Sequence, residues 1–165
     1  MAGEVSFDVV SDFDRQELVN ALDQTRREIG TRYDFKGSKV ELDLGKDEII
    51  LRADSESRAR SVRDLLESKV IRRGLSLKIL DWGEPEEAGG NTVRQRIGLR
   101  RGLPEDLAKK ISKLIRDDFP KTKSQIQGDA IRVSSRSKDD LQRVISRLRE
   151  EGEGYPVALQ FSNYR

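Results

Sequence analysis

The feature that most limits the folds open to this chain is an internal repeat. The stretch "DEIILRADSESRARSVRDLL", which begins at Asp47, aligns with "DAIRVSSRSKDDLQRVISRL", which begins at Asp129, at an offset of 82 residues. The same offset continues toward the C-terminus, and an offset of about 89 relates the segments before Asp47. That change implies a loop about seven residues shorter in the second copy. Repetition at a fixed offset indicates a duplicated structural unit.

Apolar periodicity predicts the same six elements in each copy. The first copy is expected to have strands at 5–11, 38–44, 48–54 and 75–81, a helix after the capping-box sequence at Asp14 and a helix at 57–72. The second copy is expected to have strands at 92–101, 122–127, 130–135 and 157–163, a helix with Pro104 as its first residue and a helix at 138–150. The order β-α-β-β-α-β, found twice, predicts an α+β protein made of two ferredoxin-like domains.

An acidic, glycine-containing segment separates the two copies. Residues 84–91, "EPEEAGGN", have the composition of a linker or an exposed loop, and we therefore expect a first domain at 1–87 and a second at 88–165. Charge is unevenly divided between these halves, because the first carries a net charge of -5 and the second +7. The second half is therefore the one expected to bind anions.

The composition argues against most enzyme classes. The chain has no His and no Cys, so it cannot build a Ser-His-Asp or Cys-His catalytic arrangement or the usual zinc sites. It also lacks the glycine-rich phosphate loops G-x-x-x-x-G-K-[ST] and G-x-G-x-x-G. We expect a protein without enzymatic activity, metal or cofactor. No apolar run could span a membrane and the N-terminus has no signal-peptide pattern, so we expect a cytoplasmic location without membrane contact.

Four separated segments resemble motifs of the YajQ family of bacterial proteins. They are "SFDVVSDFD" at 6–14, "TRYDFKG" at 31–37, "QIQGDAIRVSSRSKDDLQ" at 125–142 and "FSNYR" at 161–165. The resemblance implies two ferredoxin-like domains that exchange their first strands, so that 92–101 completes the first domain and 5–11 the second. It also implies a nucleotide-binding protein, with cyclic dinucleotides such as cyclic di-GMP, or RNA, as ligands of some members. No established catalytic residues come with the family.

The segment 125–142 has two interpretations. Gly128 and Asp129 predict a hairpin turn, and Ser137 with Asp140 has the spacing of a capping box. The polar residues that neither feature requires are Gln125, Gln127, Arg132 and Arg136. A phosphate could bind the free N–H groups where 134–137 enters a helix, with Arg136 as its counter-charge. We expect the hairpin and the cap, and keep a superimposed anion site as a second hypothesis.

A second candidate is the arginine row of the strand at 92–101. Strand periodicity places Arg94, Arg96 and Arg100 on one side, and the last two match an R-x-x-x-R pattern seen in some cyclic-dinucleotide sites. Three arginines on an open sheet face would suit phosphate groups. The alternative is an ordinary solvated strand face.

A third candidate is the segment "TRYDFKG". Its candidate binding residues are Arg32, Tyr33, Asp34, Phe35 and Lys36. The two aromatic residues could stack on a base, the two basic residues could hold its phosphate and the acidic residue could accept a hydrogen bond from the base edge. The alternative is a helix-to-strand corner in which one aromatic side chain fills the core and Gly37 makes the turn.

The resemblance adds the C-terminal residues Asn163 and Arg165 to the nucleotide-binding candidates. The predicted third strands, "EIILRAD" and "AIRVSS", carry no aromatic residue, so a conventional RNA-recognition surface is disfavoured. The leading interpretation is a nucleotide-binding protein without catalysis, with a cyclic dinucleotide as one candidate ligand. The alternatives are an RNA or tRNA binder that uses the basic second half, and an adaptor that binds a protein partner.

Overall fold

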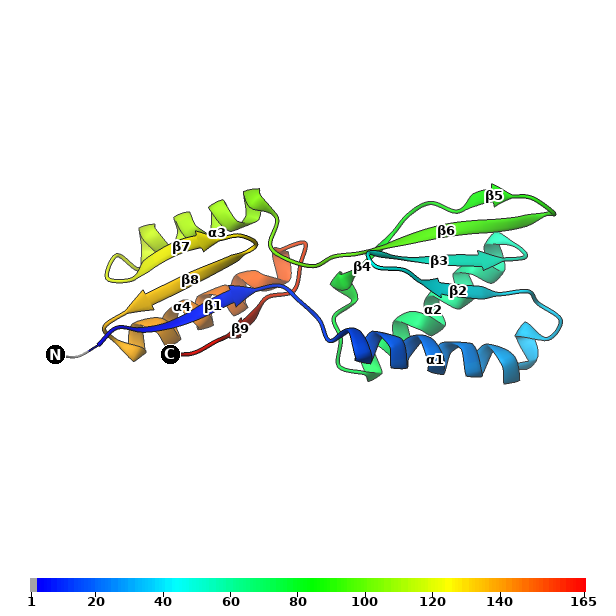
Figure 1. Ribbon diagram of the computed structural model, residues 1–165, viewed down its shortest axis with the longest axis horizontal. Helices are drawn as coiled ribbons and strands as arrows, with labels where there is room; N and C mark the ends of the chain where they lie inside the picture. Colours follow the sequence, from blue (N-terminus) through cyan, green and yellow to red (C-terminus); the bar gives the residue numbers. More distant parts are fainter. Residues whose placement is uncertain (1–2) are drawn as a thin grey trace. The chain divides into compact units, whose positions relative to one another are not determined.

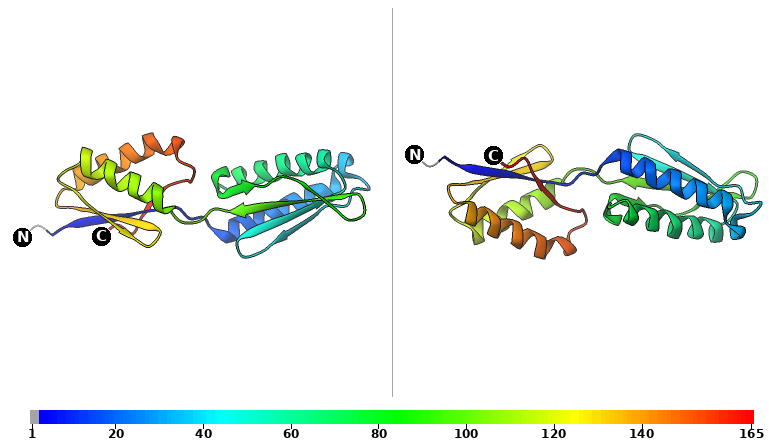
Figure 2. Two further views of the ribbon diagram at one scale, coloured as in Figure 1. Left: turned by 90° about the horizontal axis from the view of Figure 1, so that it is seen from above. Right: turned by 90° about the horizontal axis from the view of Figure 1, so that it is seen from below.

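The chain forms two antiparallel sheets, each covered on one face by two helices (Figure 1, Figure 2). A computed structural model describes residues 3–165. Among these, residues 3–12 and 101–165 form one compact unit, called unit 1, and Phe13–Arg100 form the other, called unit 2. The predicted duplicated ferredoxin-like α+β fold is confirmed. No helix in the described part of the chain is long and apolar enough to span a membrane.

Unit 2 contains a sheet in the order β2-β3-β6-β4, packed against helices α1 and α2. The strands are β2 (Glu41–Leu44), β3 (Glu48–Ala53), β6 (Thr92–Leu99) and β4 (Leu80–Trp82), and the helices are α1 (Arg15–Thr31) and α2 (Glu56–Arg72). A further strand, β5 (Glu86–Ala88), pairs with β6. The short 3-10 helices η1 (Tyr33–Phe35) and η2 (Leu77–Ile79) precede β2 and β4.

Unit 1 repeats this arrangement with a sheet in the order β7-β8-β1-β9. Its strands are β7 (Lys123–Gln127), β8 (Ala130–Ser135), β1 (Val5–Val10) and β9 (Gln160–Ser162). Helices α3 (Glu105–Asp118) and α4 (Lys138–Glu151) cover one face, and the 3-10 helix η3 (Gly152–Gly154) follows α4. Each unit has its own apolar core between sheet and helices.

One of the two inner strands of each sheet comes from the other copy of the repeat. Strand β1 pairs with β8 and β9, and β6 pairs with β3 and β4. The strand exchange implied by the family resemblance is therefore present. It is held by core packing, because Phe7 and Val9 of β1 are fully buried in unit 1 and Ile97 of β6 is fully buried in unit 2.

The exchange also redistributes charge. Residues 3–12 contribute three acidic and no basic side chains to unit 1, and residues 88–100 contribute three arginines and no acid to unit 2. Starting from -5 and +7 for the two halves of the sequence, each unit ends with a net charge of +1. The expectation of a basic anion-binding half does not apply to the folded units, because the sequence halves are not the structural units.

Several helix ends agree with the sequence in outline and differ in detail. Asp14 caps α1 by accepting from the Gln16 N–H at 2.9 Å, and Ser137 caps α4 by accepting from the Asp140 N–H at 3.3 Å. Pro104 precedes α3 as its N-cap and is not its first residue. Since proline has no N–H to donate, it suits the start of a helix at either position.

Three expected boundaries are wrong. The closing strands at 75–81 and 157–163 shrink to β4 and β9, because residues 77–79 form η2 and residues 152–159 form η3 and the irregular segment that follows it. The segment 84–91 is exposed over most of its length, as expected of a loop, but it is not a linker, since β5 lies within it and pairs with β6 across a turn. Asn91 has a positive φ of 60° in that turn, which asparagine tolerates better than most residues.

The two units differ most between the first helix and the strand that follows. Helices α1 and α3 begin 90 residues apart, whereas β2 and β7 begin 82 apart, so unit 2 has eight additional residues here. These residues extend α1 and form η1, which contains the segment "TRYDFKG". Gly37 makes the following turn with a φ of 77°. The loop difference expected from the sequence is thus located at η1.

Candidate functional site

The face of the unit 1 sheet that points away from the helices is polar. Along β1 and β8, buried residues alternate with partly exposed ones, because successive side chains of a strand point to opposite faces. Phe7 and Val133 lie in the core, so Asp8 and Arg132, which are register partners, lie on the open face. This open face is called the unit 1 face below.

A depression of about 460 Å³ lies on the unit 1 face. It is lined by Glu4, Ser6, Lys123, Gln125, Arg132, Ser134 and Arg165. Three of these side chains are cationic, one is acidic and three are neutral hydrogen-bonding groups. The combination offers cations for phosphate groups, and hydroxyl and amide groups for a sugar or a base.

Asp8 organises the centre of this face. Its carboxylate accepts hydrogen bonds from Arg132 Nε at 3.1 Å and from Asn163 Nδ2 at 2.8 Å. The hydrogen bond from Arg132 lowers the pKa of Asp8, against the opposing effect of burial, and Asn163 and the charge of Arg165 lower it further. Asp8 is therefore an anion that orients Arg132, and its low pKa is unsuited to general-base catalysis near neutral pH.

An extra residue at the C-terminus brings Asn163 into position. Asp8 is the register partner of Ser162, while Ser6 exchanges both backbone hydrogen bonds with Arg165, at 3.0 Å each. Two residues of β1 thus span three residues of the C-terminal segment, which is the geometry of a β-bulge. Asn163 has a φ of 58°, a conformation that costs most side chains energy. The bulge directs its amide toward Asp8.

The unit 1 face therefore brings together four of the residues singled out in the sequence, namely Gln125, Arg132, Asn163 and Arg165. Gln127 is two positions beyond Gln125 on the same strand and is exposed, so it shares this face at its far end.

Arg136 does not belong to this cluster. It is exposed at the entry to α4, where protein groups already occupy part of the helix terminus. Ser135 Oγ accepts from the Ser137 N–H at 3.1 Å, and Asp139 and Asp140 lie in the first turn of the helix. Two carboxylates there oppose an added anion, so the anion site at Arg136 stays a prediction with little geometric support.

The arginine row of β6 lies on the open face of unit 2, but every member has an acidic neighbour. Arg94 lies 3.4 Å from Glu86, Arg96 lies 3.4 Å from Glu48, and Arg100 lies 3.2 Å from Asp81. These acidic residues lie on β5, β3 and β4, the three strands that pair with β6. A phosphate would have to compete with these carboxylates for each guanidinium group.

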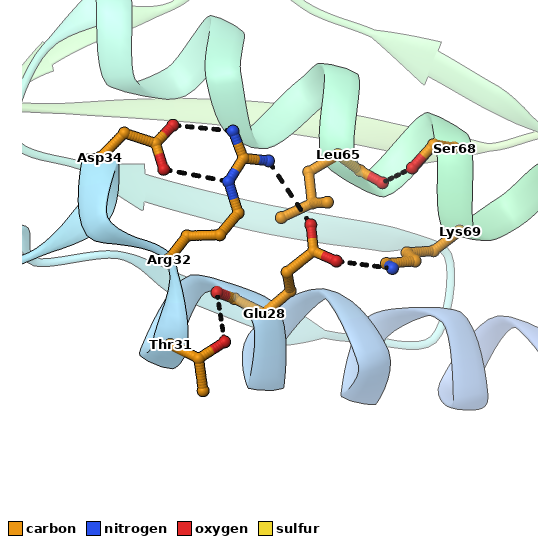
Figure 3. A network of polar contacts seen from close by, with 7 residues as sticks. All are labelled: Glu28, Thr31, Arg32, Asp34, Leu65, Ser68 and Lys69. Atoms are coloured by element: carbon orange, nitrogen blue, oxygen red, sulfur yellow. Dashed lines mark hydrogen bonds and ion pairs between the residues drawn. The ribbon is translucent and has the colours of Figure 1, made fainter.

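The segment "TRYDFKG" forms the helix-to-strand corner. Phe35 enters the core of unit 2 with 3% exposure, while Tyr33 is 87% exposed, so the two rings cannot stack on one base together. Arg32 donates to both Asp34 carboxylate oxygens, at 2.9 and 2.7 Å (Figure 3). Its guanidinium group also lies over the Phe35 ring. Lys36 is exposed, and Arg32 forms ion pairs with Glu28 and Asp34.

Sequence reasoning missed Ser6, Asp8, Lys123 and Ser134. One signal was available for Asp8, because it interrupts the apolar run of "VSFDVV" at a position that must face away from the core. Its pairing with Arg132 depends on the strand exchange, which joins residues 124 positions apart. Strand periodicity within one copy cannot predict such a contact.

Comparison with known proteins gives a consistent result. Residues 5–165 match the family described as "Nucleotide-binding protein YajQ-like". The chain is 60% identical to a protein of Chloroflexus aggregans, 55% identical to one of Trichormus variabilis and 52% identical to one of Roseiflexus castenholzii, over the full length of both chains in each case. Each of these relatives is named "Nucleotide-binding protein".

Proposed function

The chain belongs to the family of YajQ-like nucleotide-binding proteins, and from this premise we propose that it binds a nucleotide on the unit 1 face. The observation that carries the proposal is the convergence of Lys123, Arg132 and Arg165 on one depression with neutral hydrogen-bonding side chains. The cations hold phosphate oxygens, and Arg132, oriented by Asp8, offers the planar fork that matches them. Gln125 and the nearby serines bind the sugar or the edge of the base.

We propose a ligand with more than one phosphate group, and a cyclic dinucleotide such as cyclic di-GMP is our leading candidate. Lys123 is on the edge strand β7, Arg132 is on β8, and Arg165 lies beyond β1 in the C-terminal segment. Three strand spacings of about 4.8 Å separate the backbones of Lys123 and Arg165 by roughly 14 Å. That width suits two separated phosphates better than one.

Binding without chemical conversion is part of the proposal. The central carboxylate, Asp8, is held ionised by Arg132 and Asn163, so it is a poor proton acceptor at neutral pH. RNA is the competing ligand, and the unit 1 face, with three cations and two carboxylates, offers it few phosphate contacts.

Calorimetric titration with ATP, GTP, cyclic di-GMP and tRNA, each at two salt concentrations, tests the proposal. Cyclic di-GMP should bind with a modest salt dependence, whereas binding of tRNA through many phosphate contacts would weaken steeply as salt rises. Arg132→Gln should lower nucleotide affinity about ten- to a hundredfold, as expected for a lost charged hydrogen bond of roughly 1.5 to 3 kcal/mol. Arg96→Gln is the matched control on the open face of unit 2 and should change affinity less than about twofold. Equal effects of the two substitutions would rule out the unit 1 face.

A further inference from the structure

A basic groove lies between helices α1 and α2 of unit 2, away from the sheet. It is lined by Gln24, Arg27, Glu28 and Thr31 of α1, by Lys69 and Arg72 of α2, and by Arg73, the C-cap of α2. The α1 residues recur at three- and four-residue spacing, so they form one face of two helical turns, about 10 Å long. The groove has a volume of about 460 Å³.

Four of the lining residues are cationic and one is acidic, and the acid is already neutralised. Glu28 accepts from Lys69 Nζ at 2.9 Å and lies 3.4 Å from Arg32. Arg73 is paired with Glu17 of α1 at 2.8 Å. Arg27 and Arg72 are exposed and have no ion pair within residues 3–165. Two guanidinium groups at this groove are therefore available to an anion.

Lys69 is a fixed charge at the side of the groove. Only 8% of the residue is exposed, and burying a charged amine is unfavourable unless it is paired. The pairing extends through several residues, since Glu28 binds both Lys69 and Arg32, and Arg32 binds Asp34 of η1 (Figure 3). The hydrogen bond from Lys69 lowers the pKa of Glu28, so the carboxylate remains ionised and the amine remains in place.

The groove is specific to unit 2. At the offset of 82 residues, the α2 cations Lys69, Arg72 and Arg73 correspond to Glu151, Gly154 and Tyr155 of unit 1. None of these three is cationic. The segment that supplies Arg32 and Asp34 belongs to the eight residues that unit 1 lacks. Duplication alone therefore does not explain the basic groove.

We propose that this groove is a second anion site, which binds phosphate groups independently of the unit 1 face. Guanidinium groups bind phosphate oxygens through paired hydrogen bonds, and Arg27 and Arg72 supply them here, while the Lys69–Glu28 pair beside them is neutral overall. The lining contains no aromatic ring on which a base could stack, so the ligand is held by its phosphates. These phosphates belong either to a small free phosphate compound or to a nucleic-acid backbone.

Pyrophosphate is the probe for the site, and the full chain is titrated while backbone amide shifts are followed by NMR. Shifts are expected at 27–31 and 69–73. Arg72→Gln should weaken pyrophosphate binding at these residues about tenfold or more, because a charged hydrogen bond is lost. Arg60→Gln is the control, since Arg60 is an exposed residue of the same helix and lies about 120° around the axis from Arg72. It should change binding less than about twofold.

A short single-stranded RNA distinguishes the two sources of phosphate. If Arg72→Gln weakens both RNA and pyrophosphate, the groove binds a nucleic-acid backbone. If it weakens only pyrophosphate, the ligand is a small phosphate compound. No shift at 27–31 and 69–73 with either probe, or an equal loss with Arg60→Gln, would overturn the proposal. Arg132→Gln should leave these shifts unchanged, so failure at the unit 1 face and failure at the groove are observed separately.

Discussion

On the open face of unit 2, four arginines lie among five carboxylates, whereas the unit 1 face has three cations and two carboxylates. The unit 2 residues are Arg52, Arg94, Arg96 and Arg100 with Glu41, Asp43, Glu48, Asp81 and Glu86. The unit 1 residues are Lys123, Arg132 and Arg165 with Glu4 and Asp8. Counting side chains, the two faces differ in net charge by two, although the fold is the same.

The difference shows that an arginine pattern in one strand says little about anion binding. What matters is the charge on the neighbouring strands, because cross-strand partners lie only about 5 Å away. In unit 2 those strands supply Glu48, Asp81 and Glu86 to the arginine row. In unit 1 the open-face positions of β7 and β8 carry no acid, and the carboxylates beside them are Asp8, 3.1 Å from Arg132, and Glu4, 3.5 Å from Lys123.

The largest expected effect is a loss of stability that tests whether β1 belongs to unit 1. The comparison of the two faces depends on this assignment. Phe7 is fully buried and contacts Phe161 edge-to-face at a centroid distance of 5.9 Å. Phe7→Ala should destabilise unit 1 by about 3 to 5 kcal/mol. Hydrogen exchange should show lost protection in β8 and α4, although Phe7 belongs to the first copy in the sequence.

Ile97→Ala is the reciprocal variant, because Ile97 is fully buried in the core of unit 2. It should cost about 2 to 5 kcal/mol and lower protection in β3 and α2. If Phe7→Ala instead lowered hydrogen-exchange protection in β3 first, β1 would belong to unit 2. The residues assigned to the two open faces would then be wrong.

The fold was predictable from the sequence because its determinants are local and repeated. Apolar periodicity is set by which face of each element is buried, and the offset of 82 residues carries that pattern from β3 and α2 to β8 and α4. The strand exchange was not predictable from periodicity, since Phe7 and Ile97 would fill a core equally well in either unit. The family resemblance supplied it.

The candidate site was only partly predictable, for the same reason. Gln125 and Arg132 were recognised because neither a hairpin nor a helix cap requires them. Asp8 was not, since its role depends on pairing with Arg132 across the exchanged strand. The acidic partners of Arg96 and Arg100 were also missed, because a single strand does not reveal its neighbours.

A gain of binding in unit 2 would sharpen the comparison. The triple variant Glu48→Gln, Asp81→Asn, Glu86→Gln removes the acidic partners of the arginine row and should raise pyrophosphate affinity on that face about tenfold. The fold should persist, because exposed ion pairs each contribute about 0 to 1 kcal/mol. NMR titration would show new shifts along β6, and unchanged shifts would mean that charge balance does not explain the difference between the faces.

Low pH should reduce the stability that the ionised Asp8 carboxylate contributes to unit 1. Its pKa is lowered in the folded chain, chiefly by the hydrogen bond from Arg132, so its contribution to stability is present above the unfolded value of about 3.9 and is lost as pH falls through the folded pKa. Asp8→Asn should cost about 1 kcal/mol at pH 7 and less at pH 2. Denaturant unfolding at both pH values checks this, and an equal cost at both would exclude the ionic role.

The smallest expected effect concerns Arg136. It is close in sequence to Arg132 and Ser134, but it does not line the depression on the unit 1 face. A phosphate at the start of α4 would make Arg136→Ala weaken nucleotide binding about tenfold or more. We expect no change in affinity and a stability change within about 0.5 kcal/mol, because Ser135 and Ser137 already accept from N–H groups there and two carboxylates occupy the first turn.

Ser137→Ala is the control for this last case, because it removes the side chain that accepts from the Asp140 N–H. It should cost on the order of 1 kcal/mol of stability whether or not an anion binds, since the cap is lost in both situations. Only the Arg136 result therefore separates a helix cap from an anion site. If Arg136→Ala lowered affinity as much as Arg132→Gln does, the binding surface would extend from the sheet to the start of α4, and the unit 1 face would be only part of it.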